Sequence, residues 1–228
     1  MRWVFVAGAL LAGDTLAGGV YWTNRGQNRI ERAGFDGSGR ETVLLNGGTN
    51  LRGIALDTIN NLIYYADNGA DVIYRMNWDG SDRNPVLTVG PGSFPAGVRF
   101  DLTLGLLYYC DRDKDHIRRS GVDGSNPEIV IGPGTQPYYL DIDFEEGKLY
   151  WGDFDGTSAN SGNVFRANLD GSDRETVVTG TLETRAVCLD TAGGMLYWGQ
   201  PQRGKDRTRI LGGPARGRGR EPGGGNHL

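Results

Sequence analysis

The sequence predicts an all-β protein, a β-propeller made of repeated four-stranded blades, and three observations support this fold class. An aromatic pair recurs five times, with its first tyrosine at spacings of 43, 44, 42 and 47 residues. An aspartate stands seven residues before each of these tyrosines, and an Asp-Gly dipeptide follows four of them. The 38 glycines and 10% aromatic residues favour short strands and tight turns over long helices. Repeats of about 40–50 residues are typical of propeller blades.

The first two strands of each repeat are predicted from the segment that precedes the tyrosine. An apolar run ends at the recurring aspartate, as in "GIALD" and "GVRFD", and a Gly or Asn stands three residues before the tyrosine. Gly and Asn tolerate positive φ, so the run, the turn and the aromatic segment together predict a β-hairpin. The recurring aspartates are Asp14, Asp57, Asp101, Asp143 and Asp190.

The third and fourth strands are predicted around the Asp-Gly dipeptide. Segments such as "RIERAGFDG" and "VIYRMNWDG" end at this strong tight-turn signal, and a short run such as "RETVLL" follows. The predicted repeats span about residues 8–45, 51–89, 96–131 and 138–179, and a fifth spans 185–201 and continues beyond residue 201.

The aromatic pair is interpreted as structural. Inner strands of a blade lie between neighbouring blades, so both of their faces are buried, and large aromatic rings fill the gap between twisted sheets. A group that recurs in every repeat is a poor candidate for catalysis, which needs it only once. The aromatic residues are Tyr21, Trp22, Tyr64, Tyr108, Tyr150, Trp151, Tyr197 and Trp198. Side chains at the fourth motif position are expected to bind backbone amides where the strand ends, and these are Asn24, Asp67, Asp111, Asp153 and Gln200.

These segments resemble the YWTD repeat, or class B repeat, of the low-density lipoprotein receptor family over residues 1–200. The first copy keeps Tyr21-Trp22-Thr23, whereas Tyr65 and Tyr109 stand where the motif has Trp. The resemblance implies a six-bladed propeller, usually extracellular, that binds protein ligands.

The chain departs from this pattern in the number of repeats. Four units are complete, and the fifth decays after Tyr197, although the tail still aligns with the fourth unit when Gly217 is placed over Gly171. We therefore expect an incomplete ring with an exposed sheet edge, through which the chain could self-associate. A ring closed with five blades is the alternative. The expected division is a propeller over 1–201 and a basic Gly/Arg-rich tail over 202–228.

The N-terminus has two interpretations. The segment "MRWVFVAGALLAG" has the outline of a signal peptide, but Asp14 is in phase with the later repeats, which favours a first strand. No apolar run reaches the roughly 18–20 residues of a membrane span. The tail carries a net charge of +5 and the remainder −9, and an acidic body argues against nucleic acid as the main partner.

The two cysteines, Cys110 and Cys188, lie two predicted blades apart, so we expect buried, unpaired thiols. The chain has no Asn-x-Ser/Thr glycosylation acceptor. Neither feature supports secretion, so an extracellular location rests on the resemblance alone and the compartment is left unassigned.

Catalytic chemistry has few candidates. His116 is interpreted as a polar residue that opens a third strand, and the 153–162 insertion as a Gly/Ser loop in preference to a calcium loop. No cofactor or metal is predicted. The expected function is a non-catalytic protein- or peptide-binding module, and the alternative is a metal-dependent hydrolase similar to the gluconolactonase-type propellers. That alternative requires carboxylates that converge at the ring centre, and Asp71, Asp113, Asp115 and Glu183 are near suitable loops without forming a convergent set.

The predicted binding face lies where the second-to-third and fourth-to-first strand connections emerge together. Its residues differ from unit to unit, and they include the arginines and aromatics that dominate interface energies. The hypothesised contact residues are Arg25, Arg52, Phe94, Arg112, Tyr138 and Phe154.

Overall fold

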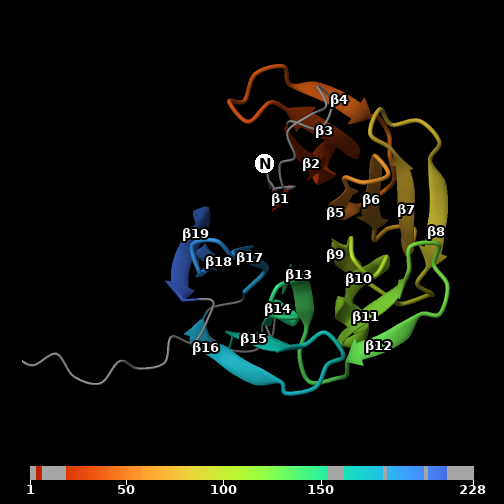
Figure 1. Ribbon diagram of the computed structural model, residues 1–228. Coiled ribbons are helices and arrows are strands. Elements are labelled where there is room, and N and C mark those ends of the chain that lie inside the picture. The colour runs from red at the N-terminus through yellow and green to blue at the C-terminus, as the bar shows by residue number, and fades with distance from the viewer. Residues whose placement is uncertain (1–3, 7–18, 154–161, 182–183, 203–204, 215–228) are drawn as a thin grey trace, which may run out of the picture.

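The computed structural model describes residues 4–6, 19–153, 162–181, 184–202 and 205–214. They form five antiparallel sheets that follow one another in an arc (Figure 1). The all-β propeller fold predicted from the sequence is confirmed, while the number of blades in a complete ring stays a prediction. No helix in the described part of the chain is long and apolar enough to cross a membrane.

Each sheet is ordered from the inside of the arc to the outside. The first sheet contains β1 (Val4–Val6), β2 (Val20–Asn24), β3 (Arg29–Ala33) and β4 (Glu41–Leu44). The second contains β5 (Leu51–Asp57), β6 (Leu62–Asp67), β7 (Val72–Asn77) and β8 (Asn84–Thr88). The third contains β9 (Pro95–Asp101), β10 (Leu106–Asp111), β11 (His116–Gly121) and β12 (Glu128–Ile131). The fourth contains β13 (Pro137–Asp143), β14 (Lys148–Asp153), β15 (Gly162–Asn168) and β16 (Glu175–Thr181). The fifth contains β17 (Ala186–Asp190), β18 (Met195–Gln202) and β19 (Lys205–Pro214).

The recurring aspartates close the first hairpin of each sheet. Oδ1 of Asp57 accepts hydrogen bonds from the backbone N–H groups of Ile59 and Asn60, at 3.0 and 2.9 Å. Asp101 and Asp143 bind the corresponding amides of their own turns. The turn position that the sequence assigned to Gly or Asn has positive φ in all four described copies, which are Asn61, Gly105, Gly147 and Gly194.

The aromatic pair holds neighbouring sheets together, because its two rings point in opposite directions. In the second sheet, Tyr64 packs in a core cluster with the third sheet, and Tyr65 packs in a cluster with the first. In the third sheet, Tyr108 packs toward the fourth and Tyr109 toward the second. Adjacent residues on a strand face opposite sides of the sheet, so one pair serves two interfaces.

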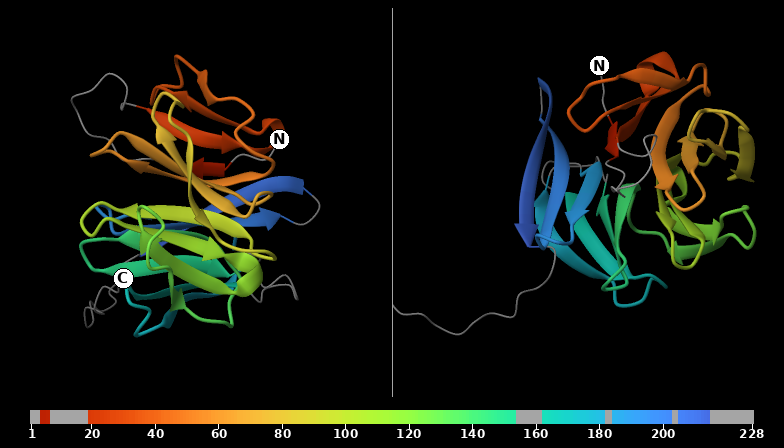
Figure 2. Two further views of the ribbon diagram at one scale, coloured as in Figure 1. Left: turned by 90° about the vertical axis from the view of Figure 1, so that its right-hand side faces the viewer. Right: turned by 45° about the horizontal axis from the view of Figure 1, so that its top comes forward.

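Four core clusters result, one at each junction between successive sheets. Among the described residues, no such cluster joins the first sheet to the fifth. Figures 1 and 2 show these two sheets as the ends of the arc. The inner strands of the second, third and fourth sheets are buried along most of their length, whereas β17 alternates exposed and covered residues because one of its faces lies at the open end.

Strand β1 forms the inner edge of the first sheet and pairs with β2. The strand described is Val4–Val6, with Val6 opposite Tyr21, and the segment of about residues 8–14 that the phase of Asp14 predicts as a strand lies outside the described residues. Asp14 itself lies outside the described residues.

The fifth sheet retains the register of its predecessor. In the fourth sheet Tyr150 lies opposite Arg166, and in the fifth Tyr197 lies opposite Gly212. Arg166 and Gly212 occupy the same place in the alignment of the tail with the fourth unit. The strand β19 thus extends the sheet beyond residue 201, to Pro214.

Both cysteines are unpaired, as predicted, but the expectation that both are buried is wrong. Cys110 is fully buried between the third and fourth sheets, whereas Cys188 is exposed. Cys188 lies opposite Tyr197 on β18. The corresponding pair in the fourth sheet is Asp141 and Tyr150, and Tyr150 packs against the fifth sheet. Cys188 therefore faces the position beyond the fifth sheet, where the described chain provides no further sheet.

Candidate binding site on the central loop face

Two kinds of connection meet at one end of the sheets, as the sequence predicts. The backbone N–H of Arg112, at the start of the 3₁₀ turn η2 (Arg112–Lys114), donates to the carbonyl of Phe94 at 3.1 Å. In the second sheet, the N–H of Asn68 donates to the carbonyl of Asn50, also at 3.1 Å. The connection after each second strand is thereby tied to the connection that enters the first strand.

The carboxylate at the fourth motif position fixes the same connections. Oδ1 of Asp111 accepts a hydrogen bond from the N–H of Phe94 at 2.9 Å, and Oδ2 accepts one from the hydroxyl of Ser93 at 3.0 Å. Asp67 binds the amides of Thr49 and Asn50 in the same way. These contacts position Phe94 at the start of β9, so a structural motif places a residue of the predicted binding face.

Arg52, Phe94, Arg112 and Tyr138 form one group, which we call the central arginine–aromatic cluster. Nη1 of Arg52 on β5 donates to the hydroxyl of Tyr138 on β13 at 2.6 Å, across the intervening third sheet. The guanidinium carbon of Arg52 lies 4.8 Å from the centre of the Phe94 ring, and that of Arg112 lies 4.0 Å from it. Guanidinium groups at such distances from an aromatic ring make favourable cation–π contacts.

Two residues of the cluster are buried and two are partly exposed. Arg52 and Tyr138 are each 7% exposed. The Phe94 side chain is partly covered, and 23% of the Arg112 side chain is exposed, where it forms an ion pair with Asp113 at 2.6 Å. Phe94 and Arg112 are therefore the more exposed members of the cluster, and Arg52 and Tyr138 are the more covered ones.

Electrostatics in the cluster disfavour the positive charge of Arg52. Burial lowers the pKa of its guanidinium, the hydroxyl groups of Tyr138 and Tyr139 act in the opposite direction, and the charges of Arg25 and Arg112 lower the pKa further. Arginine nevertheless stays charged in proteins. Three cations thus influence one another around Arg52, and Arg52 forms no ion pair with any described carboxylate.

The structure places the six predicted contact residues as follows. Four form the central arginine–aromatic cluster, and Arg25 is exposed at the start of the 3₁₀ turn η1 (Arg25–Gln27), near enough to affect the Arg52 pKa. Phe154 lies outside the described residues. Sequence reasoning missed Tyr139, whose ring centre lies 5.2 Å from that of Tyr138 and whose buried hydroxyl has no hydrogen-bond partner. Its only signal was the dipeptide Tyr138-Tyr139.

The residues considered for a metal site do not form one in the described part of the chain. Asp71 and Asp115 have positive φ in connections after second strands, and Asp113 pairs with Arg112. Glu183 lies outside the described residues. Within the described ranges, no three His, Cys, Asp or Glu side chains are placed to hold one ion.

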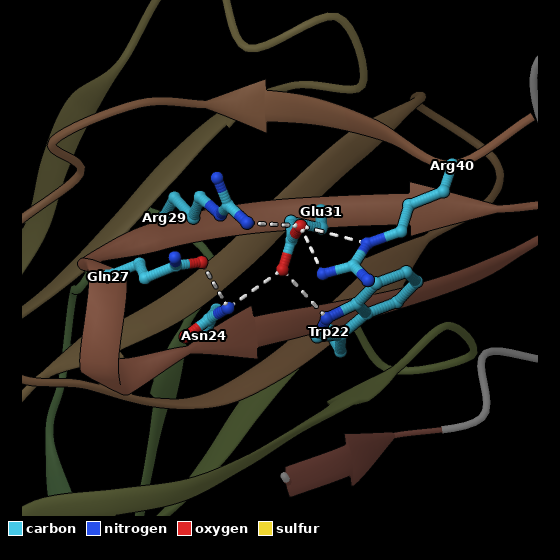
Figure 3. Close-up of polar contacts among 6 residues, drawn as sticks. All are labelled: Trp22, Asn24, Gln27, Arg29, Glu31 and Arg40. Atoms are coloured by element: carbon cyan, nitrogen blue, oxygen red, sulfur yellow. Dashed lines mark hydrogen bonds and ion pairs between the residues drawn. The ribbon is translucent and has the colours of Figure 1, made fainter. Parts of the chain in front are cut away.

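A second polar cluster lies on the face of the first sheet that points away from the second sheet (Figure 3). The Glu31 side chain, 3% exposed, accepts hydrogen bonds from Trp22 Nε1 at 3.1 Å and Asn24 Nδ2 at 3.0 Å. Its other oxygen lies 2.8 Å from Arg40 and 2.9 Å from Arg29. The first sheet thus carries a charged network around a buried carboxylate, on the face at the open end of the arc.

The fold and its repeated motif define a β-propeller of three- and four-stranded sheets joined by aromatic pairs, and comparison with known proteins finds a family with the same repeat. Residues 18–58 match the family model of the low-density lipoprotein receptor repeat class B. The resemblance predicted from the sequence is therefore confirmed, and the match covers residues 18–58. A comparison with curated proteins finds no match.

Solved structures with the same fold come from several kinds of protein. A chain from the crystal structure of a nidogen/laminin complex is 26% identical, with a TM-score of 0.69, over 81% of this chain and 68% of that one. A gluconolactonase from Xanthomonas campestris is 18% identical, with a TM-score of 0.60, over 73% of this chain and 58% of that one. TolB from Acinetobacter baumannii is 11% identical, with a TM-score of 0.66, over 87% of this chain and 49% of that one. The last two likenesses show the fold alone.

Proposed function

We propose that this chain is a non-catalytic binding module whose ligand, a protein or peptide, docks on the loop face at the central arginine–aromatic cluster. The observation that carries this proposal is Arg52, which is 7% exposed and yet has no ion-pair partner among the described carboxylates. A cation removed from water is costly unless a counter-charge compensates for it. A ligand carboxylate would supply that charge.

The cluster also suggests the chemistry of the ligand. Phe94 and Tyr138 offer aromatic surface, with ring centres 5.7 Å apart, beside the guanidinium groups of Arg52 and Arg112. Arginine and aromatic side chains are enriched among residues whose truncation weakens interfaces most. The ligand proposed is a segment with an acidic side chain next to an apolar one. The similarity to a chain from a complex of nidogen with laminin supports a protein ligand.

The test uses peptides selected on the protein itself. A random peptide library is displayed on phage and selected on the full chain, and the enriched peptides are synthesised for fluorescence anisotropy. Replacing Phe94 with Ala should weaken their binding at least about ten-fold, because a central anchor contributes roughly 2 kcal/mol or more. The matched control is Phe35→Ala, at a 55% exposed residue next to the Asp-Gly turn, at the other end of the sheets.

The outcomes separate the two ends of the sheets. Loss of binding in Phe94→Ala but not in Phe35→Ala supports the proposal. The reverse result places the binding face at the Asp-Gly turns, and failure to enrich any peptide argues against peptide recognition. Circular dichroism of each variant checks that the fold is intact.

The alternative function is metal-dependent hydrolysis, because a gluconolactonase shares the fold. It predicts that the protein binds a divalent cation and opens lactone rings with release of a proton. Lactone hydrolysis followed with a pH indicator, with and without added Ca²⁺ or Zn²⁺, tests it. Turnover that depends on the added cation would overturn the non-catalytic assignment.

A further inference from the structure

Three sheets share an arginine–glutamate–tyrosine contact at their outer part. In the third sheet, Arg119 on β11 donates to Glu128 on β12 at 2.5 Å and to the hydroxyl of Tyr108 at 3.4 Å. The first and fourth sheets repeat this contact with Arg32, Glu41 and Tyr21, and with Arg166, Glu175 and Tyr150. In each case the arginine and the glutamate are nine residues apart and directly opposite on paired strands.

The second sheet breaks this pattern. Arg75 on β7 lies opposite Tyr64 and opposite Asn84, which stands where the other sheets have glutamate. The Asn84 side chain does not replace that glutamate, because its Nδ2 donates to the carbonyl and carboxylate oxygens of Asp82, at 2.9 and 2.8 Å. Within the described residues, Arg75 and the Tyr64 hydroxyl have neither a hydrogen bond nor an ion pair.

A pocket of about 670 Å³ lies at this position, between the second sheet and the β11–β12 turn of the third. Arg75, Tyr64 and Asn84 line its polar part, and Leu62, Val86 and Val122 line its apolar part. We propose that this pocket binds a monocarboxylate with an apolar body, whose carboxylate takes the place of the missing glutamate against Arg75.

The neighbouring charges favour a monoanion over a dianion. Asp57 and Asp123 also line the pocket, and two carboxylates beside one guanidinium repel a second negative charge. Both carboxylates already accept hydrogen bonds. Those to Asp57 come from the amides of its turn and from Asn60 Nδ2. Oδ1 of Asp123 accepts one from the N–H of Ser125 at 2.9 Å. Burial and then the Asp57 charge raise the pKa of Tyr64, so its hydroxyl stays a neutral donor for the ligand carboxylate.

The probe for this pocket is hexanoate, with inorganic phosphate as the dianionic comparison. The protein labelled with ¹⁵N is titrated with each anion at constant ionic strength, and amide shifts near the pocket are followed by NMR. We expect saturable shifts with hexanoate and much weaker ones with phosphate. Phosphate binding as tight as hexanoate would overturn the monocarboxylate assignment, and no saturable shift with hexanoate would overturn the site.

The decisive variant is Asn84→Glu, which restores the contact seen in the other three sheets. The new carboxylate should occupy Arg75, weaken hexanoate binding at least about ten-fold and raise the melting temperature. The control is Thr88→Glu, which adds the same charge to an exposed residue of the same strand, β8, and should leave hexanoate binding intact. Arg75→Met should also abolish binding. Hexanoate binding that survives Asn84→Glu, or that Thr88→Glu weakens equally, would overturn the proposal.

Discussion

Nε of Arg99 on β9 lies 2.9 Å from Oδ1 of Asp141 on β13, and this ion pair joins the inner strands of the third and fourth sheets. Oδ2 of the same aspartate accepts a hydrogen bond from the N–H of Leu189 on β17 at 2.8 Å. One carboxylate therefore connects three successive inner strands. Because only 17% of either charged side chain is exposed, solvent screens the pair less than it screens a surface contact.

Replacing Asp141 with Asn should destabilise the fold by about 2–4 kcal/mol, because it leaves the guanidinium of Arg99 without its counter-charge. The matched control is Asp113→Asn, which removes a 43% exposed partner of Arg112 and should cost about 0–1 kcal/mol. Urea denaturation followed by circular dichroism measures both. Equal costs for the two variants would show that the inter-strand connection contributes no more than a surface pair.

The Glu31 network predicts a specific acid sensitivity. Burial raises the pKa of Glu31, but hydrogen bonds from Asn24 and Arg40 and the charges of Arg29 and Arg40 outweigh it and hold the pKa below its usual range. A carboxyl whose pKa is lowered by folding stabilises the protein above its unfolded pKa of about 4.3. That contribution is lost as the pH falls from this value through the folded pKa.

Glu31→Gln should therefore lower stability at pH 7 by about 1–3 kcal/mol and flatten the loss of stability below pH ~4.3. The control is Glu128→Gln, in which a 57% exposed side chain loses a surface contact with Arg119. Urea denaturation at a series of pH values compares the two. An unchanged acid slope in Glu31→Gln would mean that the network does not lower the Glu31 pKa.

The hairpins and turns could be predicted from the sequence because their signals are local. Asp57 binds amides two and three residues away, and Asn61 and Gly105 take positive φ where the residue type allows it. The aromatic pairs could be interpreted as inter-sheet packing because their spacing repeats. Such features depend on few neighbours, so a pattern of residue types identifies them.

The candidate sites could be predicted only in part, because they depend on contacts that are distant in the chain. Arg52 and Tyr138 were both on the predicted face, but no local signal shows that they touch across 86 positions. Arg75 had a signal that sequence reasoning overlooked, since the Arg and Glu nine residues apart in three repeats become Arg75 and Asn84 in the second. The exposure of Cys188 depends on which sheet ends the arc.

The two thiols should differ in reactivity. Burial raises the pKa of Cys110, which is fully buried, so it should react with Ellman's reagent only after denaturation. Cys188 is exposed, and partial covering of its sulfur and the nearby Asp141 raise its pKa, so its reaction should be slow at pH 7 and faster at pH 9. One thiol per chain should be titrated in the native protein and two in denaturant. Cys188→Ser should abolish the native reaction, and a native signal that persists in this variant would mean that Cys110 is accessible.

Gly124, in the third Asp-Gly turn, lies so close to the neighbouring sheet that a side chain there would overlap with it. Gly105 has no such neighbour and is therefore the control. Gly124 has a φ of +83°, and a Cβ atom there would lie 2.1 Å from the carbonyl oxygen of Val86 on the preceding sheet. Gly105 has a φ of +63° but no atom within 4 Å of its Cβ position. Gly124→Ala and Gly105→Ala should each lose about 1–2 kcal/mol of stability to backbone strain. Only Gly124→Ala adds a steric overlap, which should cost roughly 1–3 kcal/mol more.

Urea denaturation should therefore rank Gly124→Ala as the less stable variant by about 1–3 kcal/mol. The loss should come from the junction between the second and third sheets, where this turn meets β8. Hydrogen exchange should show faster opening of the β8 amides in Gly124→Ala than in Gly105→Ala. If both variants lose the same stability and their β8 amides exchange at the same rate, the close approach of the turn to Val86 does not hold the two sheets together.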